Sequence, residues 1–200
     1  MHVTERNISL IDVDLLISEC ILASRGKPAF AYFISPFISD FKVPAPLAKF
    51  ASNIINISDI ENFSDLIILL AQYGGKVYMV TRSPLNLVNT TISRSFIKKQ
   101  TRVLSKLYKK GCEIRVNPRL HAKVTVTSQG AVSGSFNLTE SGRFFNIEEG
   151  QFFPNVTEFR EYYLQKLVWA KDLFENRSRP LTEDDLNVNE ELLEKDVQKK

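Results

Sequence analysis

The chain has few of the residues that usually build metal sites and disulfides. Its 200 residues include only two histidines, His2 and His121, and only two cysteines. Cys20 and Cys112 lie far apart in sequence and lack the close spacing of thiolate ligands, so we expect two buried free thiols. No His-Glu-x-x-His pattern occurs. These absences exclude the common zinc-site patterns, and we predict that neither a metal nor another cofactor is required.

Long hydrophobic runs and internal repeats are also missing. No apolar segment approaches the roughly 20 residues that a membrane-spanning helix needs, and no basic segment followed by an apolar one opens the chain. We therefore expect a soluble, cytoplasmic protein that does not act at a membrane. A chain of this length can bury one sizeable core, which favours a single domain with or without a tail.

The net charge of +3 conceals an uneven distribution of charge along the chain. Seven acidic residues stand against three lysines after Leu181, so the preceding part is more basic than the whole. The segment 94–110 carries seven cations and no acid: Arg94, Lys98, Lys99, Arg102, Lys106, Lys109 and Lys110. A basic body favours a nucleic-acid partner, although such a helix face can also be simply solvated. We predict a domain over 1–179 and an acidic, flexible tail over 180–200.

Hydrophobic periodicity predicts strands and helices in alternation. Strands are expected within 29–36, 76–81, 112–118, 123–127, 131–136 and 146–154, and helices over 8–24, 47–53, 65–73 and 93–110. Asn155 and Glu158 resemble the cap of a long C-terminal helix. This order of elements indicates the α/β class, with a mixed β-sheet flanked by helices.

The stretch from His121 to Glu148 concentrates the residues that suit chemistry. Polar and apolar residues alternate over 123–127, a turn signal follows at 128–130, and a second extended run leads into 134–137. This pattern predicts a β-hairpin. Antiparallel pairing would then bring the start of the first strand next to the end of the second.

The residues at that end of the hairpin suit phosphate chemistry. The imidazole of His121 is a fitting nucleophile near neutral pH, and the ammonium of Lys123 would offset charge on the phosphate oxygens. Gly134 would allow close approach of the backbone, and the hydroxyl of Ser135 and the carboxamide of Asn137 could hold the anion.

Two further positions complete the candidate site. Glu148, with Asn146 expected on the same strand face, could hold the imidazole in one tautomer. Arg82 follows a predicted strand at the sheet edge where α/β folds bind ligands, so it is a candidate phosphate contact. An exposed charge at a strand end is the ordinary alternative for Arg82.

The pattern His-x-Lys, Gly-Ser-x-Asn and Asn-x-Glu resembles the HKD motif of the phospholipase D superfamily, and specifically its small single-motif nucleases. The matching residues are His121, Lys123, Gly134, Ser135, Asn137, Asn146 and Glu148. The resemblance implies a phospholipase D-like single-repeat domain. The chain departs from the motif at Ser128, where the family has an aspartate, and the segment from there to the glycine is one residue shorter.

The resemblance implies a metal-independent phosphodiesterase, most simply an endonuclease, that acts through a covalent phosphohistidine. Because the chain holds one motif, the active site is expected between the two subunits of a homodimer. Nucleic acid is the expected substrate, with DNA favoured over RNA, and family analogy suggests an ATPase or a restriction system as a partner. The alternatives are a phospholipase D or phosphatidyl transferase acting on lipid, and a non-catalytic binding module with the same fold.

Overall fold

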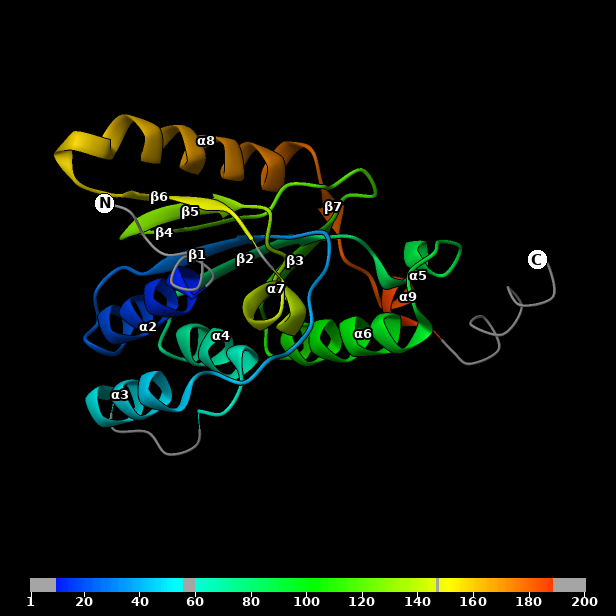
Figure 1. The fold of residues 1–200 in the computed structure, drawn as a ribbon, viewed down its shortest axis with the longest axis horizontal. Coiled ribbons are helices and arrows are strands. Elements are labelled where there is room, and N and C mark those ends of the chain that lie inside the picture. Colours follow the sequence, from blue (N-terminus) through cyan, green and yellow to red (C-terminus); the bar gives the residue numbers. More distant parts are fainter. Residues whose placement is uncertain (1–9, 56–59, 147, 189–200) are drawn as a thin grey trace.

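A seven-stranded mixed β-sheet runs through the middle of the structure, a computed structural model that describes residues 10–55, 60–146 and 148–188 (Figure 1). Its strands lie in the order β6-β5-β4-β1-β2-β3-β7. The strands are β1 (Phe30–Ile34), β2 (Lys76–Thr81), β3 (Glu113–Val116), β4 (Val124–Thr127), β5 (Gly130–Gly134), β6 (Gly150–Pro154) and β7 (Arg179–Pro180). β1, β2 and β3 pair in parallel, and the other pairs are antiparallel. The predicted α/β class with a mixed sheet is confirmed.

The central strands are apolar on both sides because helices cover both faces of the sheet. In β1, Ala31 and Phe33 face one side and Tyr32 and Ile34 the other, and all four are buried. Ile34 is paired with Val80 of β2 and with Val124 of β4. Such continuous hydrophobic runs are typical of strands buried on both faces.

Helix α8 (Arg160–Asn176) lies along one face of the sheet, and the remaining long helices lie on the opposite side (Figure 1). That second layer contains α2 (Ile11–Ser24), α3 (Ala45–Ile55), α4 (Phe63–Gln72) and α6 (Arg94–Lys109). Short helices are α5 (Pro84–Leu87), α7 (Glu140–Phe144) and α9 (Glu183–Leu186), and a 3-10 turn spans Thr157–Phe159. Within the described residues, no helix is both long and apolar enough to cross a membrane.

The two layers enclose separate parts of the hydrophobic core. Leu16, Leu66 and Leu104 are fully buried between the sheet and the second helix layer, which contains α2, α3, α4 and α6. Tyr32 and Phe174 pack between the sheet and α8. Both cysteines are free and buried, as predicted. Burial raises the pKa of Cys20 to about 12 and that of Cys112 to about 11, so both thiols stay protonated near neutral pH.

Most predicted elements are confirmed, with differences at their ends. The helix predicted over 8–24 is observed from Ile11, and residues 8 and 9 lie outside the described part of the chain. The helix predicted over 47–53 is longer, from Ala45 to Ile55. The predicted cap at Asn155 is wrong, because its Nδ2 donates to the carbonyl of Ser128 at 2.9 Å and α8 begins only at Arg160.

The segment after residue 179 is packed against the domain as far as it is described. β7 pairs with β3, and Leu181 and Asp185 are buried. Arg179 forms two hydrogen bonds of 2.6 and 2.7 Å to the carboxylate of Asp185. Burial opposes the charged form of Asp185, but these bonds and those from Thr182 outweigh it and hold its pKa below the usual value. The boundary predicted between 179 and 180 therefore falls inside packed structure, while residues 189–200 lie outside the described residues.

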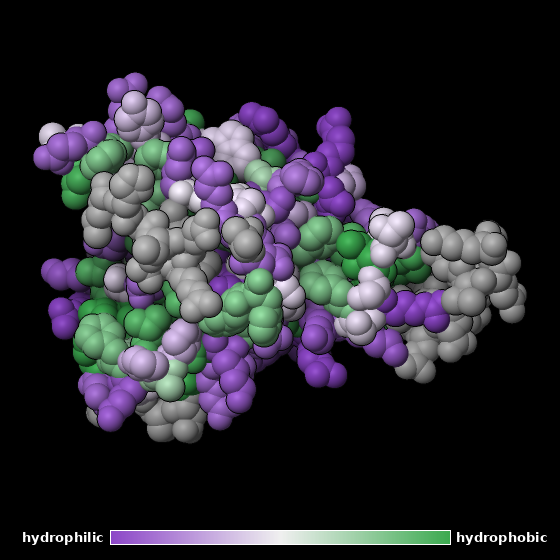
Figure 2. Space-filling model, in the orientation of Figure 1, coloured by the Kyte–Doolittle hydropathy of each residue, from purple (hydrophilic) through white to green (hydrophobic). Residues whose placement is uncertain are grey.

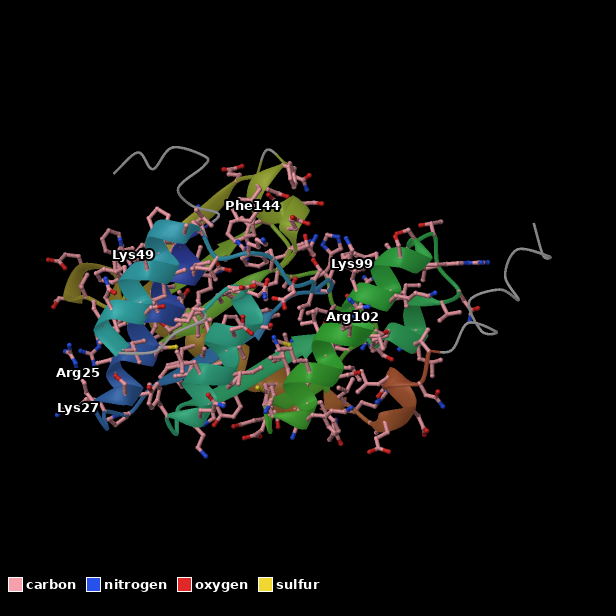
Figure 3. All side chains as sticks on the ribbon, turned by 90° about the horizontal axis from the view of Figure 1, so that it is seen from below. Arg25, Lys27, Lys49, Lys99, Arg102 and Phe144 are labelled. Carbon is pink, nitrogen blue, oxygen red and sulfur yellow. The ribbon has the colours of Figure 1, made fainter. Side chains whose placement is uncertain are left out.

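Exposed apolar residues on α3 and exposed cations on α6 are both found in the second helix layer. Figure 2 shows hydrophobic residues over α3, where Phe50 and Ile54 are exposed. Figure 3 shows Lys99 and Arg102 projecting from α6 on the side of the sheet opposite α8. The ammonium of Lys106 is instead occupied by Asp65 at 2.7 Å. The basic segment 94–110 of the sequence thus forms α6, which belongs to the second helix layer.

Candidate active site

The predicted hairpin is confirmed, and it brings the two polar clusters together. β4 and β5 pair antiparallel, with Val124 opposite Ser133, and the N–H of Gly134 donates to the carbonyl of Lys123 at 3.2 Å. His121 lies just before β4, and Ser135 lies just after β5. The two ends of the motif therefore lie together at the edge of the sheet that is formed by the ends of these strands.

His121 and Lys123 are direct neighbours at this edge. The Nζ of Lys123 lies 3.5 Å from Nδ1 of His121 and donates to the His121 carbonyl at 2.8 Å. Partial burial lowers the pKa of Lys123; Glu148 opposes that shift and Arg82 adds to it. The imidazole itself is exposed. An exposed imidazole beside a partly desolvated ammonium can attack an anion whose charge the ammonium stabilises.

A cavity of about 420 Å³ adjoins Lys123 and is lined in part by Gly134, Ser135 and Glu149. Gly134 was predicted to allow close approach of a phosphate, and the structure gives it a packing role as well. A Cβ at this position would collide with the carbonyl of Glu149 and with the ring of Phe136. A side chain here would therefore push β6 away from β5 at the floor of the cavity.

Glu148 is held by the motif's own polar residues. Ser135 donates its hydroxyl to one carboxylate oxygen, and Nδ2 of Asn146 donates to the other at 3.0 Å. The expectation that Asn146 and Glu148 share a strand face is wrong, because β6 starts only at Gly150. Within the described residues no hydrogen bond joins Glu148 to His121, so its role in orienting the imidazole stays a prediction.

The two other candidates from the sequence, Arg82 and Asn137, make contacts away from the pair of His121 and Lys123. Arg82 donates through Nε to the carbonyl of Leu120 at 2.9 Å, and its guanidinium lies over the ring of Phe37. It thus anchors the loop that leads into His121. The Oδ1 of Asn137 is buried without a hydrogen-bond partner among the described residues, and Asn137 does not line the cavity of about 420 Å³ beside Lys123.

A buried ion pair behind the site was not found from the sequence. Arg143 of α7 and Asp12 of α2 form a salt bridge, and their side chains are 1% and 0% exposed. The guanidinium of Arg143 also lies 4.6 Å from the centre of the Phe136 ring, which packs against Gly134. No pattern in the sequence links residues this far apart.

Glu19 of α2 supplies a carboxylate to the hairpin turn. Its Oε1 accepts from the N–H of Ser128 at 2.8 Å and from the Ser128 hydroxyl at 2.6 Å. Its Oε2 accepts from the N–H of Phe30 at the start of β1 at 3.0 Å. The position where the motif lacks its aspartate is therefore occupied by a hydroxyl that hydrogen-bonds to a carboxylate from another helix.

Replacing Glu19 by glutamine is expected to lower the free energy of unfolding by about 1–3 kcal/mol, because three partly buried donors lose a charged acceptor. Glu61→Gln, at an exposed position in the same layer, is the matched control and should change stability by less than about 0.5 kcal/mol. Denaturant unfolding measures both. Equal stabilities of the two variants would show that the Glu19 bridge does not hold the turn.

The donors of this edge fit an anion better than a metal ion. Across residues 10–55, 60–146 and 148–188, no group of three or more histidine, cysteine, aspartate or glutamate side chains is placed to hold a metal ion. The 420 Å³ cavity is lined by Lys123, Ser135 and Gly134, with the acidic Glu149 beside them. The ammonium of Lys123 matches the charge of a phosphate, and the ammonium and hydroxyl can donate to its acceptor oxygens.

No protein-family model and no curated protein sequence matches this chain. Its structure is similar to that of Nuc from Salmonella typhimurium, a phospholipase D family member, with a TM-score of 0.53 at 16% identity over 84% of this chain and 90% of that one. It is also similar to NucT from Helicobacter pylori, with a TM-score of 0.51 at 12% identity over 88% and 94% of the two chains. The protein therefore has the fold of the phospholipase D superfamily.

Proposed function

We propose that this protein is a metal-independent phosphodiesterase that hydrolyses nucleic acid, with DNA the favoured substrate. The observation that carries the proposal is the contact of Lys123 with His121 beside an open cavity, within a phospholipase D-like fold. The fold supports phosphodiester cleavage in general. The nucleic-acid substrate rests on the basic body of the chain and on the resemblance of the motif to single-motif nucleases.

In the proposed reaction the imidazole of His121 attacks the phosphorus atom. A bond forms between the ring nitrogen and phosphorus, and the bond from phosphorus to one ester oxygen breaks. Lys123 offsets the charge that grows on the non-bridging oxygens, and Ser135 lines the floor of the cavity beneath them. A water molecule then hydrolyses the bond from nitrogen to phosphorus and frees His121.

The leaving oxygen needs a proton, and this requirement argues for two copies of the chain. His121 is the only histidine in the described residues, so the described part of one chain offers one imidazole to the site. We propose a homodimer with two-fold symmetry, in which the same edge of both copies meets. His121 of the second copy protonates the leaving oxygen and then activates the water, and Lys123 of both copies holds the phosphate.

The test is cleavage of labelled single- and double-stranded DNA and RNA in excess EDTA. We expect cutting by the unaltered protein and a loss of about 100- to 1,000-fold in Lys123→Ala, since one charge-stabilising donor is removed. Lys76→Ala is the control, because Lys76 is exposed at the start of β2, away from the strand ends where the motif lies. The proposal is contradicted if EDTA abolishes cleavage. It is also contradicted if Lys123→Ala cleaves as fast as the unaltered protein. Cleavage of phospholipid vesicles alone would favour the lipid enzyme instead.

A further inference from the structure

A second cavity of about 490 Å³ adjoins the candidate nucleophile on the side of α8. Its polar and aromatic lining residues are Asn117, Arg119, His121, Trp169, Asn176 and Arg177. Ala122 lines this cavity and also the one beside Lys123, so the two hollows adjoin along the same short segment of chain. The candidate scissile phosphate at His121 and Lys123 would lie between them.

Trp169 forms a wall of this cavity and is fixed in place by the packing of α8. Ala170 and Phe174 are buried against the sheet, and this contact sets the direction in which Trp169 projects. The indole is half-buried and forms no ring pair with another aromatic residue of the described chain. A flat apolar surface of this kind can stack against a nucleobase.

The rim of the cavity is polar and largely fixed. Arg177 forms an ion pair with Asp172 at 2.5 Å, and Nδ2 of Asn117 donates to the Arg177 carbonyl at 2.7 Å. The Oδ1 of Asn117 accepts from the N–H of Arg119 at 2.9 Å, which shapes the loop before His121. The guanidinium of Arg119 is exposed and makes no ion pair within the described chain. One cation at the rim is therefore available to an anion.

We propose that this cavity binds the nucleotide next to the scissile phosphate, with its base stacked on Trp169 and its outer phosphate at Arg119. The inference rests on the proposed function and adds a subsite to it. The volume is within the range of pockets that enclose small organic ligands. Stacking on an aromatic ring tolerates any base, so this subsite strengthens binding without selecting a sequence.

The test uses Trp169 as its own reporter, because it is the only tryptophan of the chain. Thymidine 3′,5′-bisphosphate, which carries a base between two phosphates, is titrated into the full chain while tryptophan fluorescence is followed. We expect saturable quenching by this probe and none by deoxyribose 5-phosphate, which lacks the base. Absence of quenching by the bisphosphate overturns the proposal.

Calorimetric titration of variants with the same probe separates stacking from simple packing. Trp169→Ala should weaken binding by about 5- to 100-fold, and Trp169→Phe should restore most of the affinity. Thermal unfolding of each variant shows that it is folded, and the phenylalanine variant keeps a ring in the packing position. Equal affinity of Trp169→Ala and the unaltered protein contradicts the subsite.

The cleavage assay distinguishes failure of the subsite from failure of the proposed function. Trp169→Ala should raise the KM for an oligonucleotide about as much as it weakens binding of the bisphosphate, with a much smaller change in kcat. Cleavage with unchanged KM in this variant overturns the subsite and leaves the nuclease intact. If the bisphosphate quenches the fluorescence of Trp169 but the protein cleaves no nucleic acid, the subsite is supported. The catalytic proposal is then overturned.

Discussion

Replacing Asp12 by alanine should lower the free energy of unfolding by about 3–5 kcal/mol, which is the usual cost of removing one partner of a buried ion pair. Burial raises the pKa of Asp12, while Arg143 opposes this rise. Without Asp12, the buried guanidinium of Arg143 would lose the carboxylate of its salt bridge. Because Arg143 packs over Phe136 beneath Gly134, we expect the variant to loosen the candidate site as well.

Asp14→Ala is the matched control, since Asp14 lies on the same turn of α2 and is exposed. Its cost should stay below about 1 kcal/mol, the size of a helix-dipole contribution at the first turn. Replacing Asp12 and Arg143 together by apolar residues of similar size should recover part of the loss. Denaturant unfolding measures all three. Similar losses in Asp12→Ala and Asp14→Ala would show that the buried pair does not stabilise the fold.

The hairpin of the motif could be predicted because its signals are local. Alternation after His121, the turn at 128–130 and the second extended run all lie within a short segment, and β4 and β5 follow them closely. The apolar runs of β1 and β2 were similarly plain, because strands buried on both faces need apolar residues throughout. Local pattern thus identified both the strands and the residues that meet at their ends.

The contacts that support the motif were not predictable, because they join distant parts of the chain. Glu19 meets Ser128 only after α2 packs across the sheet, and Asp12 meets Arg143 in the same way. The proximity of Trp169 to His121 likewise depends on how α8 crosses the sheet. The contacts of the segment 180–188 are also between residues whose pairing the composition does not indicate. Asp185 accepts hydrogen bonds from Arg179 and from the hydroxyl of Thr182.

Replacing His121 by alanine should lower the rate of cleavage by about a thousandfold or more, since loss of a nucleophile removes the covalent route. Gln129→Ala, at the exposed turn on the far end of the hairpin, is the matched control and should keep nearly full activity. Both variants should unfold at temperatures close to that of the unaltered protein, because both side chains are exposed. Cleavage by His121→Ala at the normal rate would remove the basis of the proposed mechanism.

The most direct measurement of the central claim is to trap the bond between His121 and phosphorus. Labelled DNA is mixed with excess protein, the reaction is stopped with alkaline detergent after a fraction of one turnover, and the denatured protein is separated. The mechanism predicts label on the protein that survives alkali, is released by acid and maps to the peptide containing His121. Label should be absent from His121→Ala. Cleavage without any labelled protein, or equal labelling of the alanine variant, would contradict the mechanism.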